Sequence, residues 1–264
     1  MNDNLALEKK ILEQKRKDIL NEVEQKKRYQ EEIQKKLISV TKEAKGSYSQ
    51  EKENTEKIYM ILKKEIENYE EALKNPYFGR VDFDEKFGSQ EKIYIGKKGI
   101  TSTYDGEEIV VDWRAPVADL YYSGTGGEAY YKAPMGVVEG DLNLKRKFLY
   151  NEENLSKIFD EGTNEIIING EEGEGLVDEF LKINLEESRG KKLKEVVATI
   201  QKEQNDIIRW PKNLPIIVQG SAGSGKTTIA FHRSFYIREK PKRKSTLCYI
   251  RRIYQRSNRV DSKW

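Results

Sequence analysis

The sequence predicts an α+β fold that is divided into several domains. Residues 4–44 contain no Gly or Pro and are rich in Glu, Lys and Gln, which all favour helices. From Tyr77 to about Tyr150, glycines and aromatic residues become frequent and short β-type runs recur. A short apolar run at residues 215–218 then leads directly into a glycine-rich loop. These observations predict an N-terminal antiparallel coiled-coil hairpin of helices, a small mainly-β module and the start of a further α/β domain.

Residues 1–75 are expected to form the helical hairpin. One heptad position holds Leu5, Leu12, Ile19, Ile33 and Val40, with Lys26 as the interruption. The second apolar position is poorly filled, by Lys9, Arg16, Val23, Gln30 and Leu37. One face of the second helix holds Ile58, Ile61, Leu62, Ile66, Tyr69, Ala72 and Leu73. Gly46-Ser47 is the expected turn and Asn75-Pro76 the expected end. The pair would either project as a partner-binding arm or pack as a solvated helix pair on its own protein.

Residues 76–190 are expected to form the β-rich module with an acidic linker. The β-type runs are residues 92–95, 108–111, 120–122 and 129–132. At the centre stands Asp112-Trp-Arg-Ala-Pro116, which is interpreted as a Trp core residue with a strand that ends before proline. Residues 151–190 are mixed and acidic and contain the run Ile166-Ile-Ile168.

Residues 191–233 are expected to begin the third domain. Apolar residues at helical spacing predict a helix from Lys192 to Arg209, which Trp210-Pro211 ends. The apolar run at residues 215–218 is typical of a buried parallel strand, and a helix is expected to start at Thr227.

The loop between this strand and helix matches the pattern G-x-x-x-x-G-K-[ST] in full. Its residues are Gly220, Ser221, Ala222, Gly223, Ser224, Gly225, Lys226 and Thr227, followed by Thr228. The glycines let backbone N–H groups approach phosphate oxygens at the start of a helix. Lys226 is expected to contact the β/γ-phosphates and the Thr227 hydroxyl to ligate Mg²⁺. The pattern therefore predicts a P-loop that binds ATP with Mg²⁺, in a RecA-like α/β NTPase domain.

Residues around the loop resemble superfamily 1 helicases of the UvrD/Rep type. Gln204 lies sixteen residues before Gly220, and His232-Arg233 follows the loop closely. The resemblance implies that Gln204 hydrogen-bonds the adenine edge and that Arg233 lies near the base. Without this spacing, Gln204 would be interpreted as an ordinary surface glutamine on a charged helix.

The sequence is closer still to the HelD branch of that superfamily, whose members associate with RNA polymerase. The similar segments are residues 75–83, 112–116, 144–148, 198–205 and 218–228, in this order. The resemblance implies an ATPase that binds RNA polymerase and helps to free it from nucleic acid, DNA or RNA. It also implies that the arm of residues 1–75 enters the secondary channel of the polymerase.

The resemblance stops after Arg233. Residues 234–264 hold ten Lys or Arg and only two Asp or Glu. A break in the reading frame would produce such a tail, and this explanation is preferred to a basic nucleic-acid-binding tail. No Walker B carboxylates, arginine finger or second motor domain follow the loop, so hydrolysis by this chain stays an open question. The alternative function is a non-enzymatic polymerase-binding module with an idle nucleotide site.

The amino-acid composition excludes several kinds of protein and of binding site. Charged residues make up 35% and hydrophobic residues 36% of the chain, which favours an elongated part joined to a smaller folded part. One Cys and one His exclude an internal disulfide and a zinc site built from them alone. No stretch of 18 apolar residues and no signal-peptide pattern are present, so a cytoplasmic protein without a membrane partner is expected.

Overall fold

The computed structural model describes residues 3–43, 49–86, 88, 90–124, 126–161, 200–220 and 224–237, together with the backbone of 166–168 and 171–172. The chain forms two compact units, Met1–Phe180 and Leu181–Trp264. The first unit contains a helical arm and a β-sheet, and the second contains two helices and the glycine-rich loop. The four-part division expected from the sequence stays a prediction.

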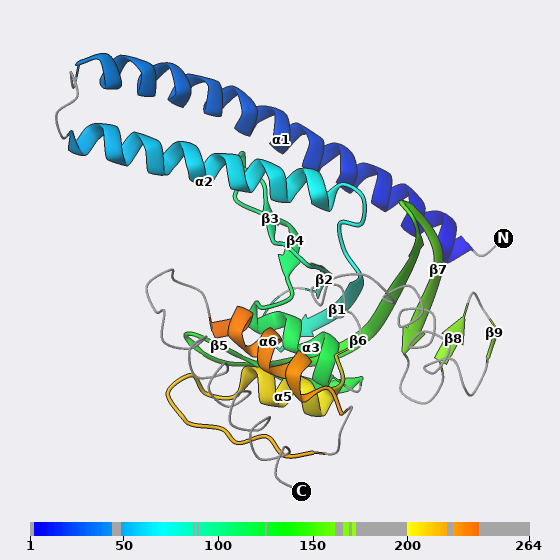
Figure 1. Cartoon of the computed structure of the whole chain (residues 1–264). Coiled ribbons are helices and arrows are strands. Elements are labelled where there is room, and N and C mark those ends of the chain that lie inside the picture. The colour runs from blue at the N-terminus through cyan, green and yellow to red at the C-terminus, as the bar shows by residue number, and fades with distance from the viewer. Residues whose placement is uncertain are drawn as a thin grey trace, which may run out of the picture. The chain divides into compact units, whose positions relative to one another are not determined.

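The arm consists of helices α1 (Asp3–Glu43) and α2 (Gln50–Ala72), which run side by side over the sheet (Figure 1). The Ser49 hydroxyl begins α2 by accepting a hydrogen bond from the Lys52 backbone N–H at 3.3 Å. The predicted heptad is confirmed, since its buried members are Leu12, Ile19, Ile33 and Val40. The expected turn at Gly46-Ser47 lies outside the described residues.

The predicted apolar face of α2 is partly wrong. Leu62, Ile66, Tyr69 and Ala72 are buried, but 41% of Ile58 and 58% of Ile61 is exposed. A pair of helices buries a single seam, so residues that flank the seam stay accessible where no third layer covers them. The arm therefore carries exposed isoleucines on α2.

The sheet confirms the β-rich module. Its strands are β1 (Gly79–Glu85), β2 (Gln90–Gly96), β3 (Ile100–Thr101), β4 (Glu108–Asp112), β5 (Gly127–Ala133), β6 (Gly136–Asn151), β7 (Asn154–Glu161), β8 (Ile166–Ile168) and β9 (Glu171–Glu172). Their order is β3-β4-β2-β1-β6-β7-β8-β9, and β5 also pairs with β6. The β2–β4 pair is parallel and every other pair is antiparallel.

The run at residues 120–122 is a helix and not the expected strand. A 3-10 helix at Pro116–Ala118 leads into α3 (Asp119–Ser123), in which Leu120, Tyr121 and Tyr122 are buried. Proline favours the first turn of a helix, and burial of three adjacent large side chains overrides their preference for strands. The interpretation of Trp113 is confirmed, because β4 ends at the preceding residue and Trp113 is 5% exposed.

The core joins the root of the arm to the sheet. Tyr77 packs edge-on against Tyr94 and Phe148, with ring centroids 4.7 and 4.9 Å away. Leu12 and Ile19 of α1 belong to the same buried cluster. Nearby, Gly79 lies directly under the ring of Tyr121, and a Cβ atom there would stand 2.4 Å from that ring. The start of β1 is therefore packed too tightly against Tyr121 to accept a side chain at position 79.

The second unit has helices α5 (Lys202–Arg209) and α6 (Lys226–Ile237). Of the helix expected at residues 192–209, residues 192–199 lie outside the described ranges, and Gln201 is already extended. Residues 215–218 form no strand, in contrast to the prediction, and 89% of Ile217 is exposed. A parallel strand needs neighbouring strands for its hydrogen bonds, and the described residues of this unit provide none.

Helix α6 continues for one turn beyond Arg233, to Ile237. The remaining basic tail and the acidic linker at residues 173–190 lie outside the described residues. Within the described part of the chain, none of the helices has the length and apolar character that crossing a membrane requires.

Candidate nucleotide-binding site and the root of the arm

The glycine-rich loop leads directly into α6. Gly220, Ser224 and Gly225 are described, whereas Ser221, Ala222 and Gly223 lie outside the described residues. Gly225 has a φ angle of +79°, a conformation that L side chains rarely adopt. Its carbonyl oxygen accepts the Ile229 N–H at 2.9 Å, so the helical hydrogen bonds start at the loop. The backbone after Gly225 is thus the N-terminus of a helix.

Lys226 lies at the first position of α6 and its ammonium group folds back over the loop. Nζ donates a hydrogen bond to the Gly220 carbonyl oxygen at 2.8 Å and lies 3.4 Å from the Ser224 hydroxyl. The positive charge is therefore held within the loop and near the first backbone N–H groups of α6. An anion placed there would meet both a full charge and unpaired helix N–H groups.

Thr227 and Thr228 occupy the first turn of α6, where backbone N–H groups have no partner within the helix. Thr227 is exposed, so its hydroxyl is accessible to a ligand. Hydroxyl oxygen suits Mg²⁺, which usually takes its other ligands from phosphate groups and water. The position fits the expected Mg²⁺ role, which stays a prediction.

Gln204 lies against the loop. It occupies the third position of α5, where its Oε1 accepts a hydrogen bond from the Gln201 backbone N–H at 3.3 Å. Its Nε2 is close to the loop, because a Cβ atom on Gly225 would stand 3.5 Å from it. The structure therefore brings Gln204 and the loop together, although contact with adenine stays a prediction.

Arg233 contacts the other end of α5. Its Nη1 donates hydrogen bonds to the carbonyl oxygens of Ile207, Ile208 and Trp210 at 3.2, 3.1 and 2.9 Å. Its Nη2 donates to Pro211 O at 3.3 Å. Ile207 O also accepts the Trp210 N–H at 3.3 Å and Pro211 O the Leu214 N–H at 3.2 Å, so the guanidinium adds a further partner to the carbonyls at the C-terminus of α5. The expected contact of Arg233 with a base stays a prediction.

His232 belongs to the packing of α6. The side chain is 2% exposed, and its Nδ1 lies 2.8 Å from the Thr228 carbonyl oxygen. Burial lowers the pKa of His232, and the contact with this carbonyl only partly opposes the effect. A neutral imidazole that donates from Nδ1 fits this environment.

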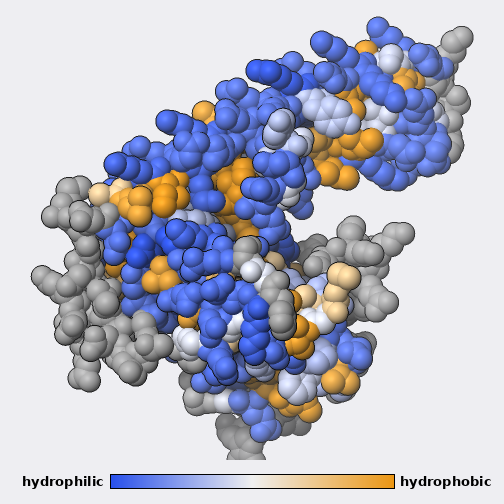
Figure 2. All heavy atoms as spheres, turned by 180° about the vertical axis from the view of Figure 1, so that it is seen from behind, coloured by the Kyte–Doolittle hydropathy of each residue, from blue (hydrophilic) through white to orange (hydrophobic). Residues whose placement is uncertain are grey.

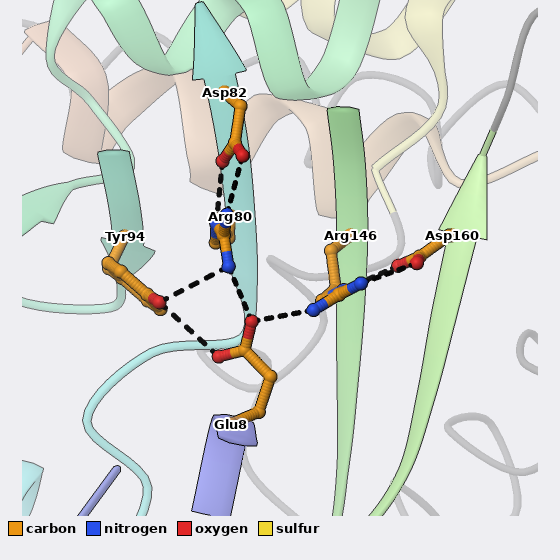
Figure 3. Close-up of polar contacts among 6 residues, drawn as sticks. All are labelled: Glu8, Arg80, Asp82, Tyr94, Arg146 and Asp160. Carbon is orange, nitrogen blue, oxygen red and sulfur yellow. Dashed lines mark hydrogen bonds and ion pairs between the residues drawn. The ribbon is translucent and has the colours of Figure 1, made fainter. Parts of the chain in front are cut away.

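A second polar site lies at the root of the arm (Figure 3). Glu8 of α1 is completely buried, and its Oε1 accepts hydrogen bonds from Nη1 of Arg80 at 2.6 Å and Nη1 of Arg146 at 2.7 Å. The Tyr94 hydroxyl donates to Glu8 Oε2 at 3.3 Å. Four elements, α1, β1, β2 and β6, therefore meet at one carboxylate.

Each arginine also has its own aspartate. Arg80 forms a two-point ion pair with Asp82 at 2.6 and 2.5 Å, and Arg146 forms one with Asp160 at 2.5 and 2.6 Å. Burial and the neighbouring Glu8 raise the pKa of the Tyr94 hydroxyl, so this hydroxyl remains a donor. The cluster supplies partners to all its charges, as buried charges require.

Sequence reasoning missed this cluster. Glu8 stands among many charged residues of a helix and has no local feature that distinguishes it. Arg80 and Arg146 were inside similar segments, residues 75–83 and 144–148, but no role was derived for them. For Arg80 the available signal was a charge next to apolar Val81 in a β-type run, since a buried charge needs a partner, whereas Arg146 stands between two lysines and offers no such signal.

Comparison with protein family models shows the family to which the chain belongs. The family model described as DNA helicase IV HelD, N-terminal domain, matches residues 5–173. The chain belongs to the HelD N-terminal domain family. The HelD match covers more than half of the chain, including the arm, the sheet and the Glu8 cluster. A comparison with curated proteins finds no match.

The HelD match ends before the glycine-rich loop. Membership in the HelD family therefore rests on the first unit, whereas the expected nucleotide binding by the loop stays a prediction. The resemblance expected from the sequence is confirmed for the N-terminal part.

Proposed function

We propose that the chain carries the N-terminal part of a HelD-type ATP-dependent helicase or translocase. In this function the arm binds RNA polymerase, the loop at residues 220–227 binds ATP with Mg²⁺, and the protein helps to free the polymerase from nucleic acid. The HelD family match over the arm and sheet is the observation that carries the proposal.

The surface of the arm supports its role in partner binding. Figure 2 shows hydrophobic residues scattered among the hydrophilic surface of the arm. Exposed large hydrophobic residues of α2 are Ile58, Met60 and Ile61, with exposed fractions of 41%, 62% and 58%. Ile58 and Ile61 are separated by three positions and so lie on one side of the helix, whereas Met60 points elsewhere. Adjacent exposed isoleucines favour contact with another protein.

Binding to polymerase is tested with variants of this surface. We expect Ile61→Glu to weaken capture of core RNA polymerase by the full chain, because charge is placed where apolar contact is expected. Met60→Glu is the matched control, since it adds the same charge to the same helix on another side. Equal capture by both variants would remove this side of the arm from the proposal.

Binding of ATP is tested at Lys226. Its ammonium lies within the loop, so Lys226→Ala is expected to remove the heat of binding when ATP with Mg²⁺ is titrated calorimetrically. Lys202→Ala, at the exposed start of α5, is the control with the same loss of charge. Wild-type protein that gives no signal with millimolar ATP would end the nucleotide part of the proposal.

A second candidate function is a polymerase-binding module whose nucleotide site is idle. It is favoured by residues 215–218, which lead into the loop without forming a strand and leave Ile217 89% exposed. A loop without a sheet behind it would hold phosphates less firmly. Polymerase capture without any ATP turnover that depends on Lys226 would favour this candidate.

A further inference from the structure

We infer that α1 carries a polar seam which fixes the direction of the arm on the sheet, and that Glu8 is its principal positioning residue. The seam consists of Glu8, Lys15 and Glu22, which are spaced by seven residues along α1. Residues two helical turns apart lie on the same side of a helix, so the three face the module together. The inference rests on the proposed function only where it concerns binding to polymerase.

Each seam residue contacts a different part of the module. Glu8 contacts Arg80 of β1 and Arg146 of β6. Lys15 donates from Nζ to the Ile109 carbonyl oxygen of β4 at 2.6 Å. Glu22 accepts hydrogen bonds from the backbone N–H of Thr103 at 3.0 Å and from its hydroxyl at 2.5 Å. The seam thus crosses the sheet from β6 to the turn between β3 and β4.

The seam ends where the module ends. The next position of the same register is Tyr29, and 48% of this side chain is exposed. From there α1 continues to Glu43 in company with α2. Residues 23–43, which follow Glu22, span about 30 Å of helix, so the part of α1 beyond the seam is longer than the part that the seam holds. A small change of angle at the seam would move the end of the arm by many ångströms.

Polar contacts fix the direction of the arm better than apolar packing does. Apolar burial has no preferred direction, whereas charged hydrogen bonds hold donor and acceptor at defined distances and angles. Glu8 also separates two buried cations, because Arg80 and Arg146 both point at its Oε1. Without the negative charge each guanidinium would keep its own aspartate, but the two cations would face each other with no anion between them, which favours movement of α1 away from them.

The seam also accounts for two of the similar segments that nucleotide chemistry leaves unexplained. Arg80 lies in the segment at residues 75–83 and Arg146 in the segment at residues 144–148. Within these segments, Gly79 makes room for Tyr121, while the two arginines form the socket for Glu8. Arg16 makes a separate contact at the root of the arm, where it donates to the carbonyl oxygens of Leu73 and Glu153.

The test measures the direction of the arm. The exposed positions Lys35 on α1 and Glu91 on β2 are each replaced by cysteine and spin-labelled in the full chain. Cys248 is replaced by serine, so that only the two new cysteines react with the label. Pulsed electron resonance then gives the distribution of distances between them. The wild-type chain is expected to show one narrow distribution. Glu8→Gln is expected to broaden it, and Glu8→Asp to broaden it less, because the charge is kept.

Two controls separate direction from stability. Glu31→Gln removes a carboxylate from the exposed surface of α1 and is expected to leave the distribution unchanged. Ile19→Ala opens a cavity at the root and lowers the melting temperature, but it leaves the seam intact and should keep the distribution narrow. A narrow distribution for folded Glu8→Gln would overturn the inference.

A milder variant keeps the inference testable if Glu8→Gln does not fold. Thr103→Val removes the hydroxyl that donates to Glu22 from an exposed turn. It is expected to broaden the distance distribution without lowering the melting temperature, and an unchanged distribution would overturn the inference.

Binding to core RNA polymerase is measured on the same samples. If the arm of Glu8→Gln spends about a tenth of its time in the competent direction, the apparent Kd rises about tenfold. Broadened distances with unchanged affinity would overturn the part of the inference that concerns polymerase. Absence of binding by the wild-type chain would contradict the proposed function, while the distances alone would still decide whether the seam sets the direction.

Discussion

Arg233 on α6 donates a hydrogen bond from Nη1 to the carbonyl oxygen of Trp210, directly after α5, at 2.9 Å. This contact and its neighbours on Ile207 and Ile208 tie the two helices of the second unit together. Gln204 is on one of these helices and Lys226 begins the other. The geometry of the candidate nucleotide site therefore depends on an arginine that lies two helical turns beyond the loop.

Replacement of Arg233 by alanine should destabilise the second unit. The substitution removes the guanidinium that donates to the carbonyl oxygens at the end of α5, including those of Ile208 and Trp210, at a cost of about 1–3 kcal/mol. We expect a lower melting temperature and weaker ATP binding, measured by calorimetry. Lys202→Ala at the exposed start of α5 should change neither. An Arg233→Ala protein with normal stability would show that the carbonyls find water as an equivalent partner.

Replacement of Gly225 by alanine should impair the loop. A φ of +79° costs an L residue about 1–2 kcal/mol, and the new Cβ would lie 3.5 Å from Nε2 of Gln204. Gly106→Ala is a matched control, because Gly106 has a φ of +77° and open space around it. Both variants should lose similar stability, but only Gly225→Ala should lose affinity for ATP. Equal ATP affinities of the two variants would show that the loop does not contribute to nucleotide binding.

Truncation of Ile19 should cost far more than truncation of Ile61. Ile19 is completely buried where α1 meets the core, so Ile19→Ala leaves a cavity and is expected to lower the free energy of unfolding by about 2–5 kcal/mol. Ile61 is 58% exposed, so Ile61→Ala should have little effect. Urea denaturation of both variants measures the difference. Similar losses would mean that Ile61 is covered in solution, for example by self-association.

Acid should weaken the contact between β6 and β7 at Glu161. Burial opposes ionisation of this carboxyl, but Lys147 and Lys145 outweigh it, and the pKa of Glu161 falls below its usual 4.5. The folded state therefore binds the proton less readily than the unfolded chain. The stabilisation is complete above the usual pKa and is lost as the pH falls through the lowered value.

Thermal melting at a series of pH values tests this assignment. Glu161→Gln should melt below the wild-type protein at neutral pH, and the difference should shrink on acidification below about pH 4.5. Glu31→Gln, in which an exposed carboxylate of the arm is changed, should show no such convergence. A constant difference for Glu161→Gln would indicate that its contribution is not electrostatic.

Local pattern was sufficient for the elements whose periodicity is long. The heptad of α1 predicted the buried positions of Leu12 and Ile19, because many turns of helix report on one face. The run at residues 120–122 was too short for this. Its residues favour strands, but the preceding proline and the burial of Tyr121 against Gly79 decide for a helix.

The other features could not be predicted from local pattern, because they depend on contacts between residues that are distant in sequence. Nothing near Glu8 in sequence announces its partners Arg80 and Arg146, since they become neighbours only when the sheet is complete. The strand expected at residues 215–218 failed for the related reason that strand formation depends on neighbours elsewhere in the chain. Gln204 lies beside the loop, as the family resemblance implied, although the residue itself looks like an ordinary surface glutamine on a charged helix.

The pairing of Glu8 with Arg146 joins residues that are 138 positions apart. During synthesis, helix α1 leaves the ribosome long before β6 and β7, so the carboxylate has no guanidinium to meet for most of translation. Local helix formation is fast, whereas contacts between distant residues are slow to form. The hairpin should therefore assemble first and swing without restraint, and its attachment to the sheet should be a late event in folding.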